Sequence, residues 1–101
     1  QEFDNVFKAA TLRRRHGALR MSAVANRIHT ARLGLVVGKR VFPEAHDRNR
    51  ARRILREAFR KRRAQLPSVD LVVQVTSNDV TNGAMKASID ALLDYLEESS
   101  L

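Results

Sequence analysis

Several sequence features are missing from this chain of 101 residues, and each absence argues against a class of function. There is no cysteine, so neither a disulfide framework nor thiol chemistry is available. No stretch approaches the ~20 apolar residues of a membrane-spanning helix, and no signal-peptide core is visible. We therefore expect a cytoplasmic chain. Because the sequence begins with Gln rather than Met, we also expect the natural protein to have further residues before it.

The signatures of common catalytic sites are missing as well. The sequence contains neither G-x-S-x-G nor G-x-x-x-x-G-K-[ST]. His16, His29 and His46 are widely separated, without an H-x-x-x-H pair, so we expect no metal site in the protein. His46 and Asp47 could form an acid–base pair, but Asp47 is more simply explained as a helix cap. We expect no side chain of this chain to break bonds.

Acidic residues are outnumbered by basic ones, 11 against 19, which gives a net charge of +8 and a pI near 11.3. Such an excess indicates a phosphate-rich partner, because each Lys or Arg that neutralises a phosphate releases counterions. A membrane surface is the competing polyanion, but the basic helix described next needs its apolar side for the protein's own core. The hydrophobic fraction of 44% is typical of a globular protein, and the length indicates a single domain over residues 1–101.

The basic residues are concentrated between Arg48 and Arg63, which holds nine of the nineteen Lys and Arg residues. At about 100° per residue, a helix here would have an apolar face and a cationic face. The apolar stripe consists of Ala51, Ile54, Leu55, Ala58 and Phe59. The opposite row consists of Asn49, Arg52, Arg53, Arg56, Arg60 and Arg63. We expect this helix to have Asp47 as its N-cap and to end near Gln65.

Hydrophobic periodicity predicts the elements on either side. Apolar residues at alternate positions predict strands over 19–25, 33–37 and 69–75. Helical spacing predicts a short helix over 2–10 and a last, outwardly acidic helix capped by Thr81 or Asn82. We interpret 12–17 as a basic turn and 26–30 as a loop. The result is an α/β (α+β) sandwich, a small mixed sheet of about four strands covered by helices, in the order α-β-β-(β)-α-β-α.

The cationic row predicts an RNA-binding helix. Arginine binds phosphates through its planar fork, and a row spaced by three and four residues follows a backbone rather than reading a duplex sequence. Asn49 adds a donor and an acceptor for a base edge or a sugar hydroxyl. A merely solvated face is disfavoured, because uncompensated arginines on one face repel each other without a partner.

Specific motifs extend this interpretation. The chain reads Lys39-Arg40-Val41 and then, from Ala45, AHDRNRARRILREAFR. In this it resembles the protein subunit of bacterial ribonuclease P, whose signature is R-N-R-x-[KR]-R-x-x-R-[EQ]-x-[FA]. The Leu-Pro-x-x-Asp run from Leu66 and the F-x-x-V-F element from Phe3 continue the resemblance over nearly the whole chain. The chain departs from the family at 42–45, where a Gly-Asn-Ala turn is common, and at Thr76 and Ser77, where basic residues are usual.

The resemblance implies an accessory subunit of a ribonucleoprotein that removes the 5′ leader from precursor tRNA. The catalytic centre and its Mg²⁺ ions would belong to a large RNA, and the protein would bind that RNA and the leader. A cleft between the first helix and the sheet would take the leader. The family fold also implies a left-handed βαβ crossover, against the usual right-handed rule.

The same resemblance assigns roles to residues of this sequence. The residues implied to bind the catalytic RNA are Arg48, Asn49, Arg50, Arg52, Arg53, Arg56 and Arg60. The residues implied to bind the leader are Phe3, Phe7, Lys39, Arg40 and Arg52. The two rings would stack on bases, which contributes ~1–3 kcal/mol per base. From the residues alone, a place in the core is the better explanation of both rings.

Two other functions remain open. The chain could be a structural RNA-binding protein of the ribosomal type, without substrate contact. A DNA-binding regulator ranks last, because no helix-turn-helix spacing precedes the arginine-rich helix.

Overall fold

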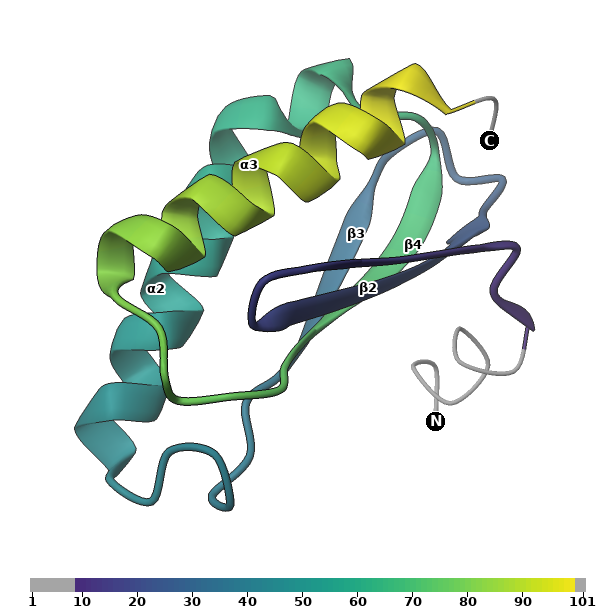
Figure 1. Ribbon diagram of the computed structural model, residues 1–101. Coiled ribbons are helices and arrows are strands. Elements are labelled where there is room, and N and C mark those ends of the chain that lie inside the picture. Colours follow the sequence, from purple (N-terminus) through teal and green to yellow (C-terminus); the bar gives the residue numbers. More distant parts are fainter. Residues whose placement is uncertain (1–8, 100–101) are drawn as a thin grey trace.

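The computed structural model of the chain describes residues 9–99 and consists of one mixed sheet with helices packed on one of its faces (Figure 1). The sheet has four strands, in the spatial order β1-β2-β4-β3. The strands are β1 Leu12–His16, β2 Leu19–Ala25, β3 Arg32–Val36 and β4 Val69–Val75. The predicted α+β architecture is confirmed for this part of the chain. The helix predicted over 2–10 lies almost entirely outside the described residues.

The helices are α2, Ala45–Arg62, which continues into a short 3₁₀ turn at Arg63–Gln65, and α3, Asn82–Glu98. The Thr81 hydroxyl accepts a hydrogen bond from the Ala84 amide at 3.0 Å, so the predicted cap of α3 is confirmed. The predicted cap of α2 is wrong. Glu44 occupies the N-cap position without a side-chain bond, because the chain turns into the helix directly after Pro43. Asp47 lies in the first turn instead, where its charge suits the positive helix end.

The segment interpreted as a basic turn is strand β1, so that interpretation is wrong. It pairs antiparallel with β2 from Leu12, opposite Ala23, to His16, opposite Leu19, and leaves only Gly17 and Ala18 for the turn. Three consecutive arginines conceal the alternation, because an arginine occupies inward and outward positions alike. The two faces of β1 become distinct only when the strand pairs with β2, which also satisfies the backbone N–H and C=O groups of β1.

Strands β3 and β4 are parallel neighbours, and α2 connects them. In Figure 1 both strands run downward, α2 rises to their left, and the more distant β3 is fainter than β4. The path from β3 through α2 to β4 is therefore a left-handed crossover, as the family resemblance implied and against the common rule.

The core lies between the sheet and the two helices. Large, fully buried side chains come from the sheet and from both helices: Leu19 and Met21 of β2, Leu71 of β4, Leu55 of α2, and Ile89 and Leu93 of α3. Burying each such side chain contributes roughly 1.5–3 kcal/mol. This packing fixes which face of α2 points outward, and so positions the cationic row.

Candidate nucleic-acid interface

The outward face of α2 presents a shallow cationic hollow. Ala51, Leu55 and Ala58 point into the core, so the opposite side of the helix faces solvent. The hollow has a volume of about 550 Å³ and is lined by Asn49, Arg52, Arg53, Arg56, Glu57 and Arg60. Five of the seven residues predicted to bind RNA are thus brought together on one surface.

Three of these arginines have no partner among the residues that the structure describes. Within residues 9–99, Arg52, Arg53 and Arg56 take part in no hydrogen bond and no ion pair. Arg53 and Arg56 are exposed, and Arg52 is half-buried. A guanidinium carries five N–H donors, so these three present fifteen donors in total to solvent or to a ligand. Clustered like charges raise the energy of the free protein, and a polyanion relieves it.

Two further arginines are held by carboxylates one turn away. Arg50 is paired with Asp47, and Arg60 is paired with Glu57, both at i, i+3 spacing. The hydrogen bond from Arg60 lowers the pKa of Glu57 although desolvation opposes it, and the charges of Arg60 and Lys61 add to the lowering. Glu57 itself raises the pKa of Arg60, so both groups stay charged at neutral pH. Such pairs steady a side chain without burying it.

Arg48, also predicted to bind RNA, has a structural contact. Its Nη1 donates to the carbonyls of Phe42 and Pro43, at 2.8 and 2.9 Å. This holds the loop before α2 against the helix. Arg63, assigned to the cationic row, donates from Nη2 to the Thr30 hydroxyl at 3.0 Å and so contacts the β2–β3 loop.

The predicted leader-binding residues are only partly placed. Lys39 and Arg40 are exposed on the turn after β3, while Arg52 lies on α2. That these three line one groove stays a prediction. Phe3 and Phe7 lie outside the described residues.

A second cationic surface escaped the sequence reasoning. It lies on the sheet face opposite α2 and α3, where Arg13 and Arg15 of β1 pair with Ser22 and Arg20 of β2. A hollow of about 470 Å³ is lined here by Arg13, Arg14, Arg15, Arg20, Ser22 and Gln74. The signal was the Gly17 turn between two runs of similar length, which indicates a hairpin.

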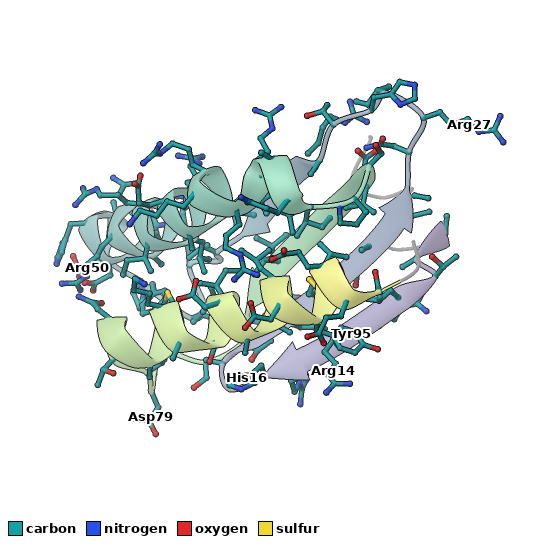
Figure 2. All side chains as sticks on the ribbon, turned by 90° about the horizontal axis from the view of Figure 1, so that it is seen from above. Arg14, His16, Arg27, Arg50, Asp79 and Tyr95 are labelled. Atoms are coloured by element: carbon teal, nitrogen blue, oxygen red, sulfur yellow. The ribbon has the colours of Figure 1, made fainter. Side chains whose placement is uncertain are left out.

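Arg14 points to the opposite side of β1, as its inward register position requires. Its guanidinium lies over the Tyr95 ring of α3 at 4.2 Å (Figure 2). On the same side of β1, His16 Nδ1 lies 3.0 Å from the Ser88 hydroxyl. These contacts attach the edge strand to α3 and leave Arg13 and Arg15 directed outward.

Charge is segregated in the folded molecule. No side chain of α3 lines the cationic hollow, although Asp90 and Asp94 share a neighbouring groove with Arg53 of α2. In Figure 2, Arg50 and Arg27 project at opposite ends of the molecule, so cations extend over its full length. The basic surfaces, rather than α3, are therefore suited to a nucleic acid.

Comparison with known proteins identifies the family. The sequence profile described as Ribonuclease P matches residues 1–97 of the chain. This chain belongs to the ribonuclease P protein family. The family resemblance inferred from the motifs is thereby confirmed.

Curated members of the ribonuclease P protein family are similar over much of the chain. The ribonuclease P protein component of Halorhodospira halophila is 44% identical over 75 residues, which cover 74% of this chain and 62% of that protein. The component of Paraburkholderia xenovorans is 36% identical over 105 residues, covering 92% and 73%. The chain thus spans less than two thirds of the Halorhodospira relative.

Solved ribonuclease P proteins share the fold. The Staphylococcus aureus protein superposes with a TM-score of 0.84 at 23% identity, covering 93% of this chain and 87% of its own. The Thermotoga maritima protein gives a TM-score of 0.80 at 24% identity, covering 100% and 94%.

Over residues 9–99, no helix is long and apolar enough to cross a membrane.

Proposed function

We propose that this chain is the protein subunit of a ribonucleoprotein ribonuclease P, an endonuclease that removes the 5′ leader of precursor tRNA. The observation that carries the proposal is the partnerless arginine row, Arg52, Arg53 and Arg56, on the helix with the family's signature. These arginines form part of the excess of basic residues that gives the chain its net charge of +8.

The α2 hollow is the surface proposed to bind the catalytic RNA. Arg53, Arg56 and Arg60 are spaced by three and four residues, which is about 4.5–6 Å along the axis at 1.5 Å per residue. A single RNA backbone can follow such a row, with one guanidinium for each of several phosphates. Each contact releases counterions, so binding should weaken steeply with salt.

The leader is proposed to lie against cations outside this hollow. Lys39 and Arg40 are exposed at the end of β3, and Arg13, Arg15 and Arg20 are exposed on the outer sheet face. A single strand needs a positively charged track and flat groups to stack on, and guanidinium planes supply both. Phe3 and Phe7 would add ring faces, as the family resemblance implies.

Bond breaking is assigned to the RNA partner and its Mg²⁺ ions. Within the described residues, no three His, Asp or Glu side chains gather where they could hold a metal ion. The Mg²⁺ would supply the metal-assisted hydrolysis when bound to the RNA. The role of this chain is then to screen the repulsion between the catalytic RNA and the leader, both polyanions.

The test is cleavage of precursor tRNA by the catalytic RNA at low Mg²⁺, with and without this chain. We expect the chain to stimulate cleavage, and more strongly for substrates with a longer leader. Retained RNA binding without stimulation would favour the second candidate, a structural RNA-binding protein. Absence of any salt-sensitive binding to the catalytic RNA would contradict both.

A further inference from the structure

Glu57 is the one acidic residue that lines the cationic hollow of α2. Residues three or four positions away on a helix are neighbours, and the charged ones at Glu57 are Arg53, Arg60 and Lys61. Surface pairs of this kind add little to folding stability. At the same time, a carboxylate within the surface that meets phosphates repels them. Its presence there needs an explanation other than stability.

The geometry leaves Glu57 able to accept another hydrogen bond. Arg60 binds both of its oxygens, with Nε 3.2 Å from Oε2 and Nη2 bonded to Oε1. Each carboxylate oxygen has two lone-pair sites, so each keeps one after Arg60 is bound. The side chain is 48% exposed, so these sites are accessible from outside. Within residues 9–99, no residue other than Arg60 donates to it.

We infer that Glu57 accepts a hydrogen bond from a neutral donor of the bound RNA and thereby selects RNA over other polyanions. This rests on the proposed RNA contact of α2. Next to every backbone phosphate that an arginine binds, RNA offers a ribose 2′-hydroxyl, and exocyclic amino groups lie in the adjacent groove. A polyanion without such a donor meets only the repulsion of the carboxylate. Glu57 therefore weakens every electrostatic encounter, and a polyanion recovers the loss only where it offers such a donor.

The experiment measures binding of the full chain to a short RNA hairpin and to its 2′-fluoro counterpart by fluorescence anisotropy. The 2′-fluoro sugar keeps A-form geometry and removes the hydroxyl donor. A third hairpin, with inosine in place of guanosine, removes the guanine amino group. We expect the wild-type chain to prefer the unmodified hairpin to one of these two by about threefold to tenfold, the effect of one net hydrogen bond. The hairpin that is disfavoured identifies the donor.

Variants separate the acceptor from the charge. Glu57→Ala should abolish the preference while strengthening binding to the modified hairpin. Glu57→Gln should retain most of the preference, because its amide oxygen still accepts. Glu98→Ala, which removes an exposed carboxylate from α3, should leave the preference unchanged and controls for net charge.

The outcomes are distinct. An equal preference in the wild-type chain and in Glu57→Ala overturns the role of Glu57, as does the absence of any preference among the three hairpins. No salt-sensitive binding of the wild-type chain to either the hairpins or the catalytic RNA overturns the proposed function itself. Circular dichroism of each variant checks the fold.

Discussion

At the scale of single side chains, the arginines of α2 differ by what already binds them. Arg48 and Arg62 are engaged by the protein, through loop carbonyls and through carboxylates of α3 respectively. Arg53 and Arg56 are exposed and have no partner in the described part of the chain. Identical residues within one helix should therefore respond differently to substitution, and the difference is measurable.

Arg56→Ala should reduce the affinity for catalytic RNA and lower the slope of log K against log[salt] by about one, because one phosphate contact is lost. The free energy of unfolding should stay within ~0.5 kcal/mol of the wild-type value, since an exposed side chain is removed. Filter binding over a salt series measures the slope. Lys86→Ala, a cation on α3, is the matched control and should leave it unchanged. An unaltered slope in Arg56→Ala would remove this residue from the interface.

Gly17 illustrates a backbone constraint at the same scale. Its φ is +55°, and a Cβ there would lie 2.7 Å from the Ser88 Oγ. Gly17→Ala should therefore lower the free energy of unfolding by ~1–2 kcal/mol, from the left-handed backbone alone, and by more through the clash. Urea unfolding measures this. Gly83→Ala, where no atom lies within 4 Å of the added Cβ, is the control and should not be destabilising. Equal effects of the two substitutions would contradict the explanation.

At the scale of elements, Arg62 joins α2 to α3 through polar contacts at the end of their apolar interface. Arg62 is bound by Asp94 and Glu97, and its Nη1 lies 3.4 Å from the Asp90 carbonyl. The hydrogen bond of Glu97, together with the neighbouring carboxylates, raises the pKa of Arg62. Asp94 and Glu97 thus attach the end of α2 to α3.

Arg62→Ala should lower the free energy of unfolding by ~1–2 kcal/mol, because it removes charge-assisted hydrogen bonds at a largely buried position. The slope of RNA affinity against salt should change little, since this arginine faces the protein. Thermal unfolding measures the stability, and RNA binding over a salt series measures the slope. If Arg62→Ala lowered the slope of RNA affinity against salt and kept the wild-type free energy of unfolding, Arg62 would contact RNA rather than α3.

At the scale of the whole molecule, acid stability depends on the point where the β2–β3 loop meets the sheet. Asp70 of β4 accepts two hydrogen bonds from Arg32, both at 2.7 Å, and one from Asn26 at 2.9 Å. These bonds, the first from Arg32, lower the pKa of Asp70 below its ordinary value of 3.8, although burial opposes the shift.

A carboxyl whose pKa is lower in the folded than in the unfolded state stabilises the fold above the unfolded value. That contribution is lost as the pH falls below about 4, through the folded-state pKa. Asp70→Asn should therefore be less stable than the wild type at pH 7, and the difference should narrow at pH 2–3. Urea unfolding across this range is the measurement. A difference that stays constant with pH would show that Asp70 acts by packing or hydrogen bonding alone.

Much of this architecture could be predicted from local pattern. The strands β2 and β4 begin and end where alternation predicts, and the apolar stripe of α2 is the buried face. Local pattern failed at β1, where arginines occupy both faces of the strand. It also failed at the start of α2, where Asp47 was the predicted N-cap and Glu44 occupies that position. At β1 the deciding contact is the pairing with β2, which the local pattern does not contain.

The sequence by itself determined that a cationic helix with an apolar underside exists, because helical periodicity needs no tertiary partner to be recognised. It also determined the family, through the order and spacing of the arginines. Only the tertiary structure decided which arginines remain available. Arg62 is bound by α3, and Arg13 and Arg15 join Arg20 across a strand pair. Asp94 and Glu97 are distant from Arg62 in the sequence, so a charge is compensated or not according to what the fold brings within hydrogen-bond distance of it.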